Sequence, residues 1–224
     1  MTDTAYSTGA VQALYLACGV FLLAAVLVLW RRDLTATVRT FAAQGVALAA
    51  IVGTLAGVER SAELAALAGG VFVLRAVALP YLIRRAMTSG GRERETEPIV
   101  NVTTSLLAAA LLTLLGYVVA QPLVELAPSP VTRAIPVGIT VVLLGFFVLV
   151  TRRRAVSQVV GFLLLDNGIT ATAFLTTAHV PLVVELGVAL DVLFAVIVLQ
   201  LLTGRMRAAF GDTDLDELRE LRDS

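Results

Sequence analysis

The chain has 224 residues, of which 58% are hydrophobic and 15% are charged, against about a quarter charged in soluble globular domains. Its 17 basic and 17 acidic residues balance, which gives no electrostatic argument for nucleic acid, and a single cysteine excludes a disulfide framework within the chain. A hydrocarbon core about 30 Å thick needs roughly 20 apolar residues per helix, so the length allows about seven spans and no soluble catalytic domain. We therefore predict an all-α polytopic membrane bundle.

Seven apolar runs, separated by arginines, acids or Pro/Gly clusters, are the predicted spans. They cover residues 9–30, 36–57, 62–83, 100–120, 134–151, 155–177 and 181–204. The segment before the first run lacks the positive n-region of a secretory signal, so we expect this run to stay as a span. The second run is the weakest because it contains Arg39 and Gln44, but omitting it would put the basic loops on alternating sides.

The arginines predict the orientation of the bundle. Those expected on one side are Arg31, Arg32, Arg39, Arg84, Arg85, Arg92, Arg94, Arg152, Arg153, Arg154, Arg205 and Arg207. The opposite connections hold only Arg60 and Arg133. By the positive-inside rule the arginine-rich side is cytoplasmic, which puts the N-terminus outside and the C-terminus inside. We expect a multi-pass protein of the cell inner (plasma) membrane.

Two domains are predicted: a transmembrane bundle over 1–204 and a cytoplasmic tail over 205–224. The tail opens with Asp and Thr capping residues, places acids in its first turn and arginines in its last, and spaces leucines three apart at 215, 218 and 221. This pattern is typical of a short amphipathic helix that rests on the membrane or on a partner subunit.

Three ionisable side chains lie deep inside predicted spans. At 1.5 Å per residue, Asp166 lies roughly 16 Å into its run, Asp191 roughly 15 Å into the last run, and Arg75 roughly 13 Å from the end of its helix. Because a charge at the bilayer centre costs about 2.5–3.5 kcal/mol on the insertion scale, such residues usually face a polar partner, a cavity or an ion path. Two acids and one cation at one level predict a network that can pass a proton.

Other polar residues add to this candidate path. Asn167 and Thr170 lie on nearly the same helix face as Asp166, and Gln44 and Gln200 are further polar candidates. Glu185, one turn inside its helix, is expected to serve as an entry or exit carboxylate. We expect no metal, cofactor or catalytic site, since a single His, a single Cys and scattered acids lack ligand spacing, and the chain carries no phosphate loop or nucleophile motif.

Alternative readings of these residues are structural. Arg75 can pair with an acid merely to fix helix register. Glycines recur at a spacing of four in Gly53 and Gly57, and at a spacing of seven in Gly138 with Gly145 and in Gly161 with Gly168. Small residues let helices approach closely, and packing within the chain is the favoured interpretation over dimerisation.

Three segments resemble the hydrogenase-4 component E family: Arg153–Ile169, Pro181–Asp191 and the tail from Asp214 to Arg222, with a looser match at Leu74–Pro80. Members are membrane subunits of group 4 [NiFe]-hydrogenase and formate hydrogenlyase complexes. Their last three helices, here 155–204, are similar to the K subunit of complex I and to the C subunit of multi-subunit Na⁺/H⁺ antiporters.

The resemblance implies that Asp166 takes the place of the glutamate in the family's Glu-Asn-Gly motif, and that Glu185 and Asp191 match its acids in the last helix. The chain departs from the family at two positions. Asp166 is one methylene shorter than glutamate, and Arg75 stands where a lysine is typical. Because arginine keeps its proton, Arg75 can influence its neighbours only electrostatically.

The leading hypothesis is a non-catalytic membrane subunit of a hydrogenase-like or complex-I-like assembly, which lines a proton or cation path through Asp166, Asp191 and Glu185. Redox chemistry would then belong to partner subunits. The first alternative is a subunit of a cation/proton antiporter or a related ion-transport complex, and the second is a structural scaffold. In each case the first two spans are expected mainly to complete the bundle.

Overall fold

The computed structural model describes residues 7–31, 33–88, 101–152 and 155–176, and all regular structure within these ranges is helical. Six helical segments there are long and apolar enough to cross a membrane: Thr8–Trp30, Leu34–Glu59, Ala62–Arg85, Val102–Leu126, Thr132–Thr151 and Ser157–Thr176. They coincide with the first six predicted runs, which confirms the helical class. The predicted seventh run, 181–204, and the predicted tail lie outside the described residues.

The first two helices form an antiparallel pair with capped ends. Helix α1 (Thr8–Trp30) and helix α2 (Leu34–Glu59) are joined by a short connection, and the Asp33 side chain accepts hydrogen bonds from the backbone N–H groups of Thr35 and Ala36. Such a cap satisfies donors that have no partner within the helix. At its other end α2 stops at Arg60, whose φ of 52° is left-handed.

The third span coincides with the run predicted over 62–83, but it is not one regular α-helix. It consists of α3 (Ala62–Val71), the π-helix η1 (Phe72–Ala78) and α4 (Leu79–Thr88). The π-helix is explained by Pro80, because proline has no backbone N–H and its ring collides with the carbonyl four residues earlier in a regular α-helix. Widening the preceding turns relieves that collision, and π-helical turns are found frequently at functional sites.

The second half of the described chain consists of α5 (Val102–Leu126), the short 3₁₀ helix η2 (Thr132–Ala134), α6 (Ile135–Thr151) and α7 (Ala155–Thr176). Helix α5 continues beyond the predicted end at residue 120 and contains Pro122. The prediction was wrong at this end because it stopped the span at a Gln-Pro pair, whereas the helix accommodates the proline in its last turns.

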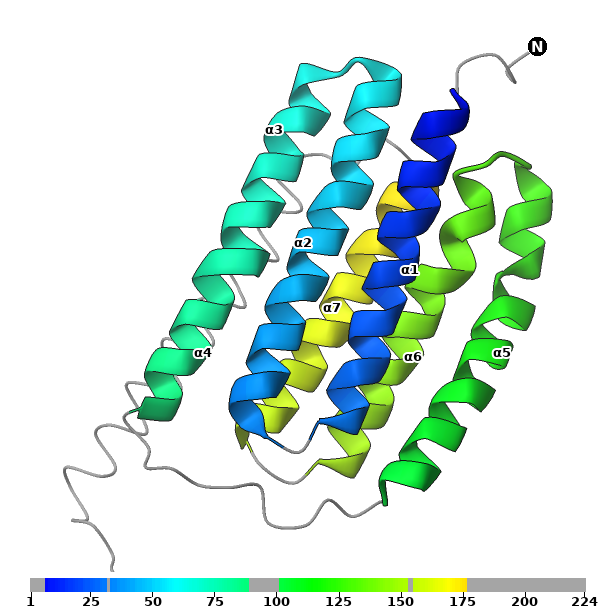
Figure 1. Ribbon diagram of the computed structural model, residues 1–224. Coiled ribbons are helices and arrows are strands. Elements are labelled where there is room, and N and C mark those ends of the chain that lie inside the picture. The colour runs from blue at the N-terminus through cyan, green and yellow to red at the C-terminus, as the bar shows by residue number, and fades with distance from the viewer. Residues whose placement is uncertain (1–6, 32, 89–100, 153–154, 177–224) are drawn as a thin grey trace, which may run out of the picture. The chain divides into compact units, whose positions relative to one another are not determined.

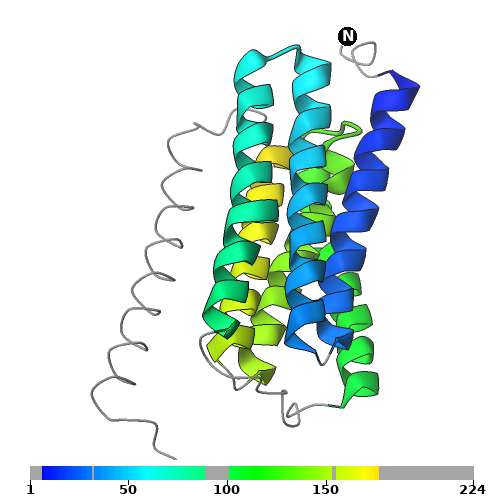
Figure 2. The same ribbon diagram turned by 60° about the vertical axis from the view of Figure 1, so that its left-hand side comes forward.

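Figures 1 and 2 show α7 beside α2 and α6, with the third span against α2. The C-terminal ends of α1, α4 and α6 and the N-terminal ends of α2, α5 and α7 lie at one end of this bundle (Figure 1). Arg31, Arg39, Arg84, Arg85 and Arg152 are at or near those helix ends. The described arginines that were predicted to share a side therefore do so.

Glycines line the seam between α6 and α7. A Cβ built on Gly145 would lie 2.6 Å from backbone atoms of Leu165, and one built on Gly168 would lie 2.6 Å from the backbone nitrogen of Val142. Both contacts are shorter than real side chains allow, so the two helices approach this closely only because glycine has no side chain. This confirms packing within the chain as the role of the glycines that are spaced seven apart. In the pair that is spaced four apart, by contrast, a Cβ built on Gly57 would have no atom within 4 Å.

Gly145→Ala is expected to lower the free energy of unfolding by about 1–3 kcal/mol, because the added methyl forces two packed backbones apart. The matched control is Gly53→Ala, where a Cβ would meet only the Cβ of Ala68 at an ordinary 3.9 Å. Thermal unfolding in detergent can be followed with a thiol-reactive fluorophore, because Cys18 is the single cysteine of the chain and is buried. Equal midpoints for the two variants would contradict the prediction.

Candidate functional site

A buried ion pair joins the third span to α7. The Nη1 atom of Arg75, on the π-helix η1, lies 2.7 Å from Oδ2 of Asp166. Only 1% of the arginine side chain is exposed, and 11% of the aspartate side chain. An uncompensated charge at such a position is costly, so each member of the pair stabilises the charge of the other.

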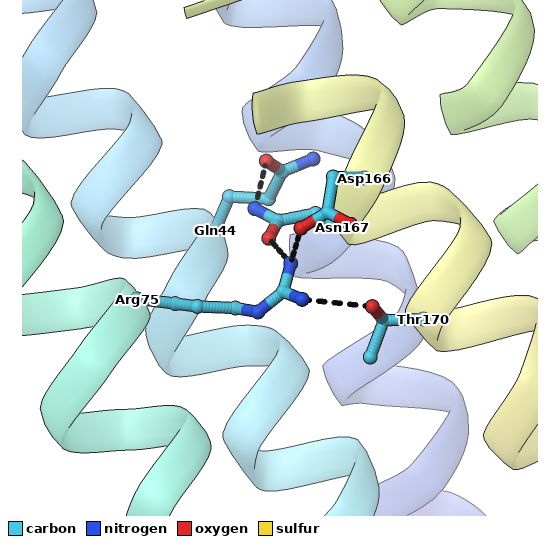
Figure 3. A network of polar contacts seen from close by, with 5 residues as sticks. All are labelled: Gln44, Arg75, Asp166, Asn167 and Thr170. Carbon is cyan, nitrogen blue, oxygen red and sulfur yellow. Dashed lines mark hydrogen bonds and ion pairs between the residues drawn. The ribbon is translucent and has the colours of Figure 1, made fainter. Parts of the chain in front are cut away.

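Two further residues of α7 hold the guanidinium (Figure 3). Nη1 of Arg75 donates to Oδ1 of Asn167, and Nη2 donates to Oγ1 of Thr170 at 2.9 Å. Asp166, Asn167 and Thr170 are grouped because Thr170 follows Asp166 by four residues and Asn167 by three, and residues at these spacings share a helix face. One face of α7 thus presents a carboxylate, an amide and a hydroxyl to a single arginine.

The amide of Asn167 extends the network to α2. Its Nδ2 donates to Oε1 of Gln44 at 2.9 Å (Figure 3). The guanidinium has donors only, so Asn167 must accept through Oδ1 and donate through Nδ2, and Gln44 must accept through Oε1. This sequence of contacts fixes the orientation of both amides and leaves Nε2 of Gln44, fully buried, without a hydrogen-bond partner among the described residues.

The charges of the network determine its chemistry. Arginine stays protonated in proteins, so Asp166 is the member of the network that can take up and release a proton. With an ionised carboxylate the Arg75–Asp166 pair is neutral, and uptake of one proton leaves it with a charge of +1. Because the pair is almost completely buried, this change in charge acts at short range on groups that are poorly screened by water.

The structure brings together five residues singled out from the sequence: Gln44, Arg75, Asp166, Asn167 and Thr170. Asp191, Glu185 and Gln200 lie outside the described residues, so their place in a path stays a prediction. Within the described ranges no three His, Cys, Asp or Glu side chains are grouped so that they could hold a metal ion.

Gln44 was singled out from the sequence as a polar candidate, although the span that carries it was expected mainly to complete the bundle. Helix α2 supplies Gln44 to the network, and its neighbour Gly45 lies against the backbone of Arg75. The π-helical backbone that carries Arg75 was not predicted from the sequence. Pro80, five residues further on, is the one signal in the sequence that points to it.

Comparison with known proteins gives relatives along most of the chain. "Uncharacterized protein Rv0085" of Mycobacterium tuberculosis is 54% identical over 209 residues, which cover 92% of this chain and 94% of that protein. Hydrogenase-4 component E of Escherichia coli K12 and that of Shigella flexneri are each 27% identical over 182 residues, covering 81% of this chain and 84% of theirs.

No family model and no solved structure matches the chain. The identity of 27% to hydrogenase-4 component E is distant, although the similarity extends over most of both chains and is not confined to one motif. The Mycobacterium tuberculosis relative is twice as similar. The chain therefore belongs to the same family as this mycobacterial protein, and hydrogenase-4 component E is its distant homologue.

Proposed function

We propose that the chain is a non-catalytic membrane subunit of a hydrogenase-like or complex-I-like redox complex, in which Asp166 takes part in proton or cation translocation. The distant homology to hydrogenase-4 component E supports the type of complex. Six helices of membrane length support a subunit embedded in the bilayer. Redox chemistry would take place in partner subunits.

The observation that carries the ion-translocation proposal is the Arg75–Asp166 pair at 2.7 Å inside the bundle. Ionisable groups at membrane depth are rare and mark ion pathways and proton relays. Asp166 supplies a carboxylate that can bind and release a proton, and Arg75 supplies a fixed charge that favours the ionised form. Asn167, Thr170 and Gln44 hold the arginine and so keep this charge at a defined distance from the carboxylate.

The proposal extends to the part of the chain beyond Thr176. There a seventh span over 181–204 would complete the bundle, with Asp191, Glu185 and Gln200 continuing the path. The N-terminus would lie outside and the C-terminus in the cytoplasm, with the tail of residues 205–224 resting on the membrane or on a partner subunit. Both the multi-pass location in the plasma membrane and the similarity to the K subunit of complex I belong to this proposal.

Isolation of the native complex tests the proposed assembly. Membranes from the source organism, solubilised in mild detergent, are expected to yield the full-length chain together with other membrane subunits and with large subunits of a hydrogenase or quinone oxidoreductase. Recovery with antiporter subunits and without redox subunits would instead support the cation/proton antiporter alternative. Recovery of the chain by itself would contradict both assemblies. The chain is isolated through an affinity tag, and a mock purification from a strain with the untagged chain is the control.

A second candidate function is a structural scaffold. It is favoured by the way in which Asp166, Asn167 and Thr170 all bind Arg75, because such a buried arrangement can fix helix packing without moving ions. A charge-neutral variant with both Arg75→Gln and Asp166→Asn separates the two functions. Native ion translocation by a complex containing this variant would support the scaffold, and its loss with assembly intact would support the ion path.

A further inference from the structure

Helix α2 touches the π-helix η1 at one point of especially close approach. A Cβ built on Gly45 would lie 2.7 Å from the carbonyl carbon and the carbonyl oxygen of Arg75, and 2.9 Å from the backbone nitrogen of Ala76. Ordinary contacts of this kind begin at about 3.4 Å. Any side chain at residue 45 therefore requires the two backbones to separate by several tenths of an ångström.

The obstacle at this point is backbone, so no flexible side chain can turn aside to make room. The peptide bond that follows Arg75 is part of η1. A displacement of this backbone moves the Cα from which the Arg75 side chain extends. Its guanidinium is held across the bundle at 2.7 Å from Asp166 and 2.9 Å from Thr170, so it has little freedom to compensate.

The other glycines of α2 do not have this environment. A Cβ on Gly53 would meet only the Cβ of Ala68 at 3.9 Å, and Gly57 has no atom within 4 Å. The need for glycine on α2 is thus confined to the residue that faces the Arg75 backbone. Its neighbour Gln44 accepts the hydrogen bond from Asn167, so consecutive residues of α2 contact the network from η1 and from α7.

We propose that Gly45 is a positioning residue, which lets the Arg75 backbone approach α2 closely enough for the guanidinium to pair with Asp166. This rests on the proposed function and deepens it, because it assigns to α2 the control of the fixed charge beside the translocating carboxylate. Gly45 acts through Arg75 and contacts no transported ion itself.

The first test measures positioning in the purified full-length chain, without reference to transport. Gly45→Ala is introduced into the native protein and into Asp166→Asn, and thermal unfolding is followed by labelling of Cys18. We expect Gly45→Ala to lower the midpoint by roughly 2–8 °C in the native background. In the Asp166→Asn background, where the Arg75–Asp166 ion pair is absent, the loss should be less than about half as large. Gly53→Ala, in the same two backgrounds, should leave both midpoints nearly unchanged.

The second test measures ion translocation in membrane vesicles that contain the assembled complex. Gly45→Ala is expected to lower the coupled rate by about 10-fold or more, because small displacements of positioned groups have large effects on rate. In an Arg75→Gln background the same substitution should lower the remaining rate by less than about 2-fold. A purely structural role would produce the same loss in both backgrounds.

Equal effects of Gly45→Ala in the paired backgrounds would overturn the proposal, as would native behaviour of Gly45→Ala. Failure of Gly45→Ala to accumulate in both the native and the Arg75→Gln backgrounds would also overturn it, because Gly45 would then serve backbone packing alone. If Asp166→Asn leaves translocation intact, the proposed function fails, while the unfolding measurements still decide whether Gly45 positions Arg75.

Discussion

Asp166→Asn is expected to reduce coupled ion translocation by the assembled complex to about a hundredth or less of the native rate, the usual scale for losing a group that transfers a proton. Asparagine has nearly the same shape and still offers an oxygen to Arg75, but it cannot bind and release a proton. Translocation can be measured with a pH-sensitive dye in inverted membrane vesicles, energised by the electron donor of the co-purified redox subunits. Electron transfer and subunit content are measured on the same vesicles.

Two variants control this experiment. Glu125→Gln removes an exposed carboxylate at the end of α5 and is expected to leave translocation unchanged. Asp166→Glu keeps a carboxylate at the position and should retain a substantial part of the native rate. Native translocation by Asp166→Asn in a fully assembled complex would remove this residue from the ion path.

Arg75→Gln is expected to destabilise the protein by about 3–5 kcal/mol, because it leaves the carboxylate of Asp166 buried without its counter-charge. The combined variant Arg75→Gln with Asp166→Asn should recover a large part of this loss, since no unpaired charge remains. Thermal unfolding of the purified protein, followed by labelling of Cys18, measures both variants under one set of conditions.

The matched control is Arg39→Gln, which removes an exposed arginine of α2 and should change the stability by less than about 0.5 kcal/mol. A single Arg75→Gln variant as stable as the native protein would show that the pair contributes little to folding. A combined variant no more stable than Arg75→Gln would show that Arg75 stabilises the bundle through contacts other than Asp166.

The predicted spans matched the six described membrane-length helices because hydropathy along the chain reports directly on burial in lipid. Errors occurred where backbone geometry departs from a uniform α-helix. The third span contains a π-helix before Pro80, and α5 continues past Pro122. A window of apolar residues registers neither feature, because both depend on where backbone hydrogen bonds form and not on how apolar the side chains are.

The sequence predicted only part of the candidate site, namely the level at which its charged residues lie. Depth in the membrane is a local quantity, counted at about 1.5 Å per residue from the end of a helix, so the sequence placed Asp166 and Arg75 at a similar level. It left open which acid Arg75 contacts, because a level in the membrane fixes neither the rotation of a helix nor the identity of its neighbours.

By itself, therefore, the sequence determined the helical class and the position of the six described helices of membrane length, and it put Arg75 and Asp166 at a similar level along their helices. Only the tertiary structure decided that Arg75 pairs with Asp166 and that Asn167 links the pair to Gln44 on α2. The physical reason is packing: close approach at Gly45, Gly145 and Gly168 sets which helix faces meet, and such contacts join residues far apart in the chain.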